Sequence, residues 1–313
     1  MKDFIKRLKD KFFRLILHYQ TKLIISLLII EFFSNEKPGY SQVDDSTKKI
    51  QHQKIFFLTT LGTGYTGGLF FLNHVWYANQ KSSQFHFFND GREWYYMDKT
   101  GHLFFTYQIS RAGNRWFRQA GFSEKNCLWW GGLLGAILLT PIELFDGYSS
   151  GYGASGWDAL SNLGGSAWFI SQEMLFSKQI LEIKFSYRNS PYASIRPEVL
   201  GRTVAQRIIK DYNGQTYWFC SNAGNLSGNN KENLLKVFGI ALGYGAEGLI
   251  YGNNELNVLS FKEIYIAPDI DLTKLPVKNV LLKKIFFYLN FYHLPLPALG
   301  YNTKDGWLWS WMY

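Results

Sequence analysis

The sequence predicts a mainly α fold, in which an apolar four-helix bundle is followed by a smaller α+β region. Three observations support this class. Within residues 42–177, four apolar segments of helical length are joined by short polar or glycine-rich links, as in a compact bundle. Beyond Ser177, short segments alternate apolar and polar residues, as strands do. Nearly half of the 313 residues are apolar, which is enough to bury a sizeable core.

The four predicted helices are residues 55–77, 97–118, 127–145 and 157–175. The first contains no charged side chain and is long enough either to cross a bilayer or to form a buried core helix. Its Gly64 and Gly68 have the spacing at which small residues let helices approach closely, and Gly131 and Gly135 in the third helix repeat that spacing. Pro141 should kink the third helix or end its regular part.

The C-terminal region, residues 178–313, mixes strands with helices. The predicted strands are residues 182–187, 216–221 and 263–272, and the predicted helices are residues 200–210 and 280–291. Pro268 should confine its strand to a sheet edge or a bulge, because proline has no amide proton to donate. Residues 238–251 are rich in glycine and fit either a strand pair or a broken helix.

The first 41 residues have the layout of an export signal. A basic, amphipathic start precedes the unbroken apolar stretch Leu23–Ile30, and Gly39 and Ser41 give a small-x-small pattern just before Gln42. The apolar stretch is short for a bilayer span. We therefore expect residues 1–41 to be a signal peptide that is cleaved, with an uncleaved amphipathic anchor as the alternative.

Composition and charge narrow the class of partner. The net charge is +9, but the first 41 residues hold eight Lys and Arg against four acids, which leaves +5 for the rest of the chain. That part has no long basic stripe, so nucleic acid is not an expected partner. Aromatic residues reach 18%, and Trp and Tyr favour membrane interfaces and ligand grooves. Neither Cys127 nor Cys220 belongs to a CxxC pair, so a cysteine metal site is not expected.

Three of the predicted helices each carry a polar pair in or beside an apolar segment, where charge is costly. The pairs are Asp98 and His102, Glu143 and Asp146, and Asp158 and Asn162. A bundle with short links can bring such pairs to one end of its core, which is how helical bundles build metal sites.

This convergence predicts a metal-assisted hydrolase or transferase. Asp98, His102, Glu143 and Asp158 would act as catalytic residues or as ligands of a divalent metal, which the ligand types alone do not identify. The same residues could instead form a satisfied buried network that fixes helix register without chemistry.

Further binding candidates flank these residues. They are Lys99, Asp146, Gly147, Asn162, Asp211 and Asn213. The last two belong to the run Asp-Tyr-Asn-Gly, which is first of all a turn signal. His86 lies among phenylalanines and is expected to be packed rather than to bind a ligand. The sequence has no P-loop, GxSxG, HExxH or dinucleotide-binding fingerprint.

Several long runs resemble the YfiM-like family of uncharacterised bacterial envelope proteins, in its Bacteroidota branch. The runs are FHFFNDGREWYYMDKTGHLFFTY, IELFDGYSSGYGASGWDALSNLGG, IKDYNGQTYWF, LGYGAEGLIYG and DIDLTKLP. The similarity covers roughly residues 52–300. A shorter pattern, Asp98-Lys99-x-x-His102 with a downstream Glu and a Ser-x-x-Asp-x-x-x-Asn segment, is also similar to VanZ-like membrane proteins, more loosely.

The resemblance implies an exported or membrane-associated protein of mostly helical fold, without an assigned activity. Members are often described as predicted periplasmic lipoproteins, although no cysteine follows the apolar stretch of this chain to carry a lipid. The resemblance carries over one set of site positions, namely Asp98, Lys99, His102, Glu143, Asp146, Gly147, Asp158 and Asn162.

The sequence therefore predicts an envelope protein that faces the periplasm, is associated with a membrane, by preference the outer one, and binds or processes lipid or cell-wall material. The alternative is a non-catalytic assembly or scaffold factor of the outer envelope, which would have a protein partner there. The first expectation requires the polar pairs to meet in one pocket, whereas the second does not.

Overall fold

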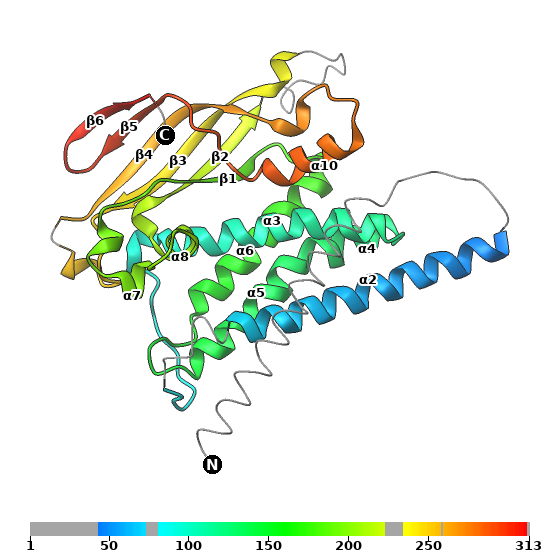
Figure 1. The fold of residues 1–313 in the computed structure, drawn as a ribbon, viewed down its shortest axis with the longest axis horizontal. Helices are drawn as coiled ribbons and strands as arrows, with labels where there is room; N and C mark the ends of the chain where they lie inside the picture. Colours follow the sequence, from blue (N-terminus) through cyan, green and yellow to red (C-terminus); the bar gives the residue numbers. More distant parts are fainter. Residues whose placement is uncertain (1–42, 73–80, 223–233, 258, 312–313) are drawn as a thin grey trace.

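The computed structural model describes residues 43–72, 81–222, 234–257 and 259–311. The signal peptide predicted for residues 1–41 lies outside these ranges. The described chain forms a layer of packed helices followed by a six-stranded antiparallel sheet, which agrees with the predicted fold class (Figure 1).

The helical layer follows the predicted order. Its helices are α2 (Val43–Leu72), α3 (Met97–Gln119), α4 (Glu124–Asn126), a π-helical turn (Cys127–Gly131), α5 (Gly132–Gly147) and α6 (Gly156–Phe176). The first helix begins earlier than predicted, and Pro141 lies inside α5 without ending it. Helices α3, α5 and α6 pack against one another, and the Tyr65 hydroxyl of α2 donates to the Leu138 carbonyl of α5 at 2.9 Å.

The two glycine pairs with the same spacing differ in what they contact. A Cβ atom on Gly135 would lie 2.2 Å from the Thr106 carbonyl oxygen of α3, so this glycine lets two helix backbones approach closely. A Cβ atom on Gly131 would lie 2.6 Å from the Asn114 Cα atom of α3. Gly64 and Gly68 in α2 have no atom within 4 Å of that position. The predicted close packing is therefore found at the second pair and not at the first.

The sheet is a meander in which every strand pairs with its neighbour in the chain. Its strands are β1 (Glu182–Tyr187), β2 (Gln215–Asn222), β3 (Phe238–Glu247), β4 (Phe261–Ile270), β5 (Ala298–Asn302) and β6 (Gly306–Ser310). At the outer edge of β1, the Phe185 amide donates to the Phe291 carbonyl at 2.9 Å, and the His293 amide donates to the Phe185 carbonyl at 2.8 Å. Residues 291–293 thus extend the sheet beyond β1.

Three sequence predictions in this region need correction. Residues 238–251 form one strand and a short irregular segment after it, rather than a strand pair or a broken helix. The helix predicted for residues 200–210 is two short helices, α7 (Pro197–Leu200) and α8 (Val204–Lys210), which Gly201 separates with a φ of 103°. The last helix, α10 (Val280–Leu289), ends two residues early. Pro268 lies where β5 no longer pairs with β4, as an edge position requires.

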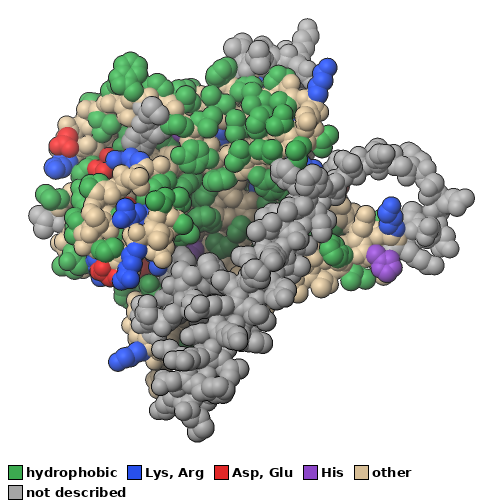
Figure 2. Space-filling model, in the orientation of Figure 1, with side chains coloured by type: hydrophobic (Ala, Val, Ile, Leu, Met, Phe, Trp, Pro, Cys, Tyr) green, Lys and Arg blue, Asp and Glu red, His purple; other side chains and the backbone are tan. Residues whose placement is uncertain are grey.

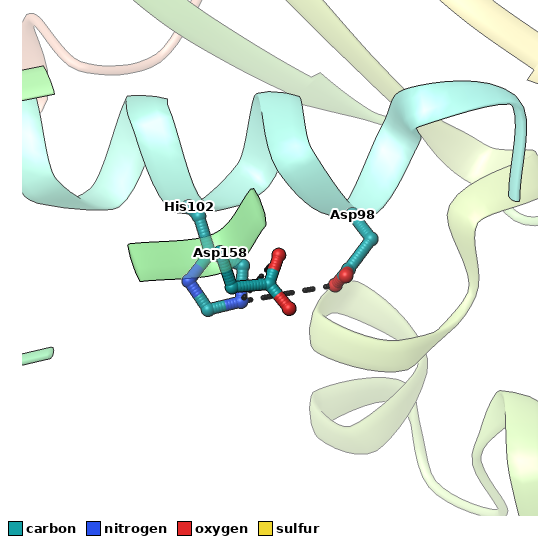
Figure 3. A group of neighbouring side chains, drawn as sticks. All are labelled: Asp98, His102 and Asp158. Carbon is teal, nitrogen blue, oxygen red and sulfur yellow. Dashed lines mark ion pairs between the residues drawn. The ribbon is translucent and has the colours of Figure 1, made fainter. Parts of the chain in front are cut away.

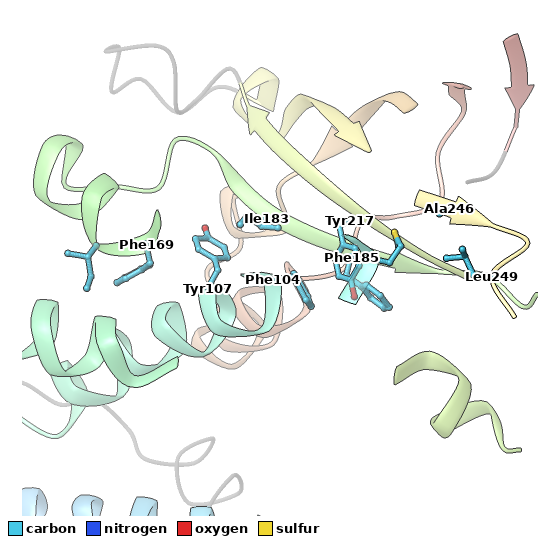
Figure 4. Close-up of a cluster of buried hydrophobic side chains, with 10 residues drawn as sticks. Phe104, Tyr107, Phe169, Ile183, Phe185, Tyr217, Ala246 and Leu249 are labelled. Carbon is cyan, nitrogen blue, oxygen red and sulfur yellow. The ribbon is translucent and has the colours of Figure 1, made fainter. Parts of the chain in front are cut away.

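The core joins the helical layer to β1 and β2. Phe104 of α3 stacks on Phe185 of β1 with ring centroids 5.6 Å apart, and Tyr217 of β2 is equally close to Phe104 (Figure 4). Met97 and Tyr107 extend the same cluster along α3. Helix α3 therefore lies between the sheet and helices α5 and α6, and its side chains reach both.

Among the described residues, one helix is long and apolar enough to cross a membrane. It is the continuous segment Glu124–Gly147, which includes α5. The sequence of α2 fits either a membrane span or a core helix. Over its described length, α2 does not count as a candidate membrane span.

Candidate functional site

Asp98 and His102 lie on one face of the first two turns of α3, and Asp158 lies in the first turn of α6 (Figure 3). The His102 Nε2 atom is 3.9 Å from Asp98 Oδ1 and 3.7 Å from Asp158 Oδ1. One donor atom from each of the three residues lies within 4.8 Å of the other two. The structure therefore brings together three of the four residues that the sequence proposed as catalytic or metal-binding.

The start of α6 fixes the position of Asp158. Ser155 caps this helix, because its hydroxyl oxygen accepts the Asp158 amide at 3.1 Å. The same hydroxyl donates to Asp90 Oδ1 at 2.5 Å. Asp90 comes from the segment before α3, which is thereby tied to the cap of α6. Sequence reasoning did not single out Asp90 as a site residue.

Lys99 is the cation at the centre of the cluster. Its buried ammonium lies 2.5 Å from Asp90 Oδ2, 2.8 Å from Asp98 Oδ2 and 2.6 Å from Asp158 Oδ1. A charge buried to this extent is tolerated only when it is paired, and here three carboxylates from three segments share one lysine. Lys99 therefore holds the first turn of α3, the first turn of α6 and the preceding segment together.

The other ring nitrogen of His102 faces away from the aspartates. Its Nδ1 atom donates to Asn162 Oδ1 at 3.0 Å, and the Thr106 hydroxyl donates to the same oxygen at 3.0 Å. Such a contact fixes the ring orientation and leaves Nε2 directed at Asp98 and Asp158. Asn162, predicted as a binding residue, thus acts by orienting the histidine. Its own Nδ2 atom is buried and has no hydrogen-bond partner within the described ranges.

Glu143, in α5, lies on the Nδ1 side of the same ring. Its Oε1 atom is 3.9 Å from His102 Nδ1, and it is buried without a hydrogen-bond partner in the part of the chain described. Burial raises the pKa of Glu143 to about 8, against the attraction of His102 and with added repulsion from Asp158. This raised pKa favours the protonated form of Glu143 at neutral pH, and the carboxyl group faces a different ring nitrogen from the two aspartates.

The surroundings drive the remaining pKa values apart. Burial alone would raise the pKa of Asp98, but the charges of His102 and Lys99 and the hydrogen bonds from Lys99 and Tyr212 lower it to about 2. Burial and repulsion by Asp98 raise the pKa of Asp158 to about 7, although His102 and Lys99 oppose the rise. Burial would lower the pKa of His102, but three neighbouring carboxyl groups raise it. Separation of this kind is typical of sites that assign acid and base roles to neighbouring groups.

Tyr212 was missed by sequence reasoning. Its hydroxyl donates to Asp98 Oδ1 at 2.6 Å from the turn that precedes β2. The neighbours predicted as binding residues hold that turn instead. Asn213 donates to Asp211 Oδ1 at 2.8 Å and accepts the Leu249 amide at 2.7 Å. The structure therefore places the tyrosine of this turn, not Asp211 or Asn213, against the cluster.

The last two candidates lie at the end of α5. Asp146 is half-buried one turn after Glu143 and adds to the rise in the pKa of Glu143. Gly147 is a packing position, since a Cβ atom there would lie 2.3 Å from the Phe85 ring. The ring nitrogen Nε2 of His86 donates to the Tyr152 carbonyl at 2.7 Å, so His86 ties two loops together.

A mostly apolar cavity of about 490 Å³, open to the surface, adjoins the cluster. Glu143 and Ser155 are in its wall, and the remaining lining residues are Phe85, Phe87, Ala136, Ile137, Thr140, Pro141, Leu144, Ala154, Gly156 and Ala159. A second cavity of about 480 Å³, lined mainly by Phe87, Phe88, Trp157 and Leu160, shares part of that wall. Polar groups at one end of an apolar hollow are typical of small-molecule sites.

Comparison with known proteins gives one similarity. Residues 86–172 match a family described as Predicted periplasmic lipoprotein (DUF2279). This stretch runs from the segment before α3 almost to the end of α6, so it holds the whole cluster except Tyr212. No curated protein and no solved structure matches the chain. The predicted similarity to a periplasmic lipoprotein family is thus confirmed over these residues, and an exported envelope protein is the placement that the family description indicates.

Proposed function

We propose that this chain is an exported envelope protein that binds an amphiphilic lipid or cell-wall molecule. The polar group of that molecule would meet the cluster around His102, and its apolar part would occupy the adjoining cavity. The observation that carries the proposal is the position of Glu143, which lies 3.9 Å from the His102 ring and also in the wall of the apolar cavity. The family description supports the envelope placement.

The cluster has the composition of a divalent metal site. Asp98 and Asp158 offer carboxylate oxygens, and His102 offers Nε2, a donor set that suits zinc, manganese or iron. Asn162 holds the other ring nitrogen, as the outer contacts of metal-binding histidines commonly do. An ion held there would polarise an ester or phosphate group of the bound molecule.

Metal content of the purified full chain tests this part of the proposal. The protein is freed of metal, exposed to Zn²⁺, Mn²⁺ or Fe²⁺, dialysed and analysed by mass spectrometry. We expect a stoichiometric ion in the wild type and in His86→Gln, and its loss in His102→Gln. If neither the wild type nor His102→Gln holds a stoichiometric ion, the metal-assisted version is wrong.

The cavity is tested separately, through lipid that co-purifies with the chain. Ala159→Trp should fill the cavity and remove bound lipid detected by mass spectrometry. Ala205→Trp is the matched control, because Ala205 is exposed on α8. Equal lipid content in both variants and the wild type would show that the cavity is not the binding site.

The closed ion network favours a second function, that of a non-catalytic scaffold. Lys99 already pairs with three aspartates, so the cluster can hold helices in register without a ligand. Asp158→Asn separates the two functions, provided that circular dichroism shows an intact fold. A scaffold would keep a co-purifying protein partner in this variant, whereas the proposed site would lose its metal ion and its bound molecule.

A further inference from the structure

One face of the sheet is apolar over β3 to β6, and no described helix covers it there; we call it the bare sheet face. The residues of this bare sheet face are Ile240, Leu242, Ile264, Ile266, Leu299, Tyr301, Trp307 and Trp309. Register places them together, since Leu242 pairs with Ile266, which pairs with Leu299, which pairs with Trp309. All eight are exposed, with Ile264 at 58% and Trp307 at 73%. A patch of this kind on a soluble surface marks an interaction site.

The bare sheet face continues a face that is already covered. Leu242 pairs with Phe219 of β2, and Phe219 pairs with Ile183 of β1. Ile183 and Phe219 pack into the core beneath α3. Figure 1 shows β3 to β6 extending away from the helical layer, and Figure 2 shows hydrophobic side chains gathered over that part of the molecule. The helices therefore cover only the β1–β2 part of one apolar face.

The opposite face of the same strands is buried and mixed, because Trp218, Tyr265 and Ala267 pack there beside polar groups. Glu263 and Asp269 of β4 are buried there, and Lys184 of β1 reaches across to Asp269 with a 2.8 Å ion pair. An antiparallel sheet with one wet face normally directs its polar side chains outward. Here the carboxylates of β4 point inward and aliphatic side chains point outward, which is the arrangement expected where the outer surroundings are themselves apolar.

The side chains of the bare sheet face indicate which apolar surroundings these are. Its aliphatic residues lie in β3, β4 and, with Leu299, β5, and none of its residues is a carboxylate. Its tryptophans lie on the edge strand β6, with Trp311 next to them. Tryptophan concentrates at the boundary between membrane and water, whereas aliphatic side chains prefer the acyl region. Residues 86–172 match a family described as periplasmic lipoproteins, and such proteins lie next to a bilayer.

We propose that the bare sheet face docks on a lipid bilayer, with the β3 and β4 residues in the outer acyl region and the β6 tryptophans at headgroup level. Backbone groups at an open sheet edge cannot lie in hydrocarbon without a heavy penalty. Because β6 pairs only with β5 within the described chain, the sheet lies on the bilayer surface and does not span it. This surface is separate from the His102 cluster, so the inference does not rest on the proposed function.

A local fluorescent label tests the docking surface in the full chain. Ile264→Cys places a thiol on the bare sheet face, and Val204→Cys on α8 is a control with a similar exposed fraction. The native Cys127 and Cys220 are buried, so an environment-sensitive dye reacts with the introduced thiol. Vesicles of phosphatidylethanolamine and phosphatidylglycerol are then added, and the emission of each label is measured.

We expect the label at position 264 to shift to shorter wavelength with vesicles and the label at position 204 to stay unchanged. Binding through any other part of the chain would leave the label at 264 in water, so an absent shift overturns the proposal. Equal shifts at both positions also overturn it. A shift that grows with protein concentration without vesicles would show that the face binds a second copy of this chain instead.

Discussion

Acidification should destabilise the folded chain through one buried histidine, His293. Its ring is fully buried and stacks on Trp218 with centroids 4.0 Å apart and planes 10° from parallel. Nε2 donates to the Pro268 carbonyl at 3.2 Å, while Nδ1 has no hydrogen-bond partner within the described chain. The site therefore accommodates the neutral ring and offers the second proton nothing to bind.

The size of the effect follows from the pKa. Burial lowers the pKa of His293 from 6.5 to about 4, against the attraction of Asp269 and with the repulsion of Lys184. Between these two pH values, His293 binds a proton in the unfolded chain but not in the folded chain. The free energy of unfolding therefore falls as the pH falls. The contribution is complete above pH 6.5 and is lost as the pH drops through 4. At about 1.4 kcal/mol for each unit of pKa, the loss is about 3 kcal/mol.

The measurement is urea unfolding, followed by circular dichroism, at several pH values between 7 and 4. His293→Phe keeps a ring on Trp218 but cannot take up a proton. Carboxyl groups away from position 293 titrate alike in both proteins, so the difference between the two pH profiles reports on His293. The free energy of unfolding should fall by about 3 kcal/mol more in the wild type than in His293→Phe. His52→Gln, at an exposed position on α2, should follow the wild type. Parallel pH profiles of the wild type and His293→Phe would refute the reasoning.

Two further predictions concern packing and buried charge, and both are measured by urea unfolding. Gly135→Ala should lower the free energy of unfolding by about 1–3 kcal/mol, because its Cβ would force α5 away from α3. Gly64→Ala should leave the free energy of unfolding unchanged or raise it by up to about 1 kcal/mol. Equal effects of the two substitutions would contradict this explanation by helix packing. Lys184→Met should cost about 3–5 kcal/mol by leaving Asp269 buried and uncompensated. The double variant Lys184→Met, Asp269→Leu should recover most of that loss, and a loss equal to the sum of the single changes would argue against a pairwise effect.

The helices could be read from the sequence because their signals are local. Helix α3 ends within one residue of its predicted limit, and α6 within one residue at either end. Strand β3 could not be read in this way. Its Gly243 lies where the Trp218 ring passes, since a Cβ atom there would be 2.7 Å from that ring. This glycine makes room for a side chain of the neighbouring strand β2, so the sequence around Gly243 does not indicate its role.

In the candidate site, too, the residues on helices could be predicted from the sequence and the residues in turns could not. The four-residue spacing of Asp98 and His102, with Asp158 on a helix joined by short links, was enough to predict that these side chains meet. Tyr212 and Asp90 reach the cluster from turns, and no periodic pattern connects a turn to a distant helix. Spacing alone also failed to separate Gly135 from Gly64, because closeness depends on the partner helix.

The meander order of the sheet has a consequence for how the chain folds. Each strand finds its partner in the next segment of the chain, so the hairpins can close one after another at little cost in loop entropy. The free edge of β1 is the exception. Phe185 bonds to residues 291–293, which are synthesised long after it. During synthesis, that edge stays open until most of the sheet has been made, and it is therefore a place where a nascent chain is exposed to pairing with another.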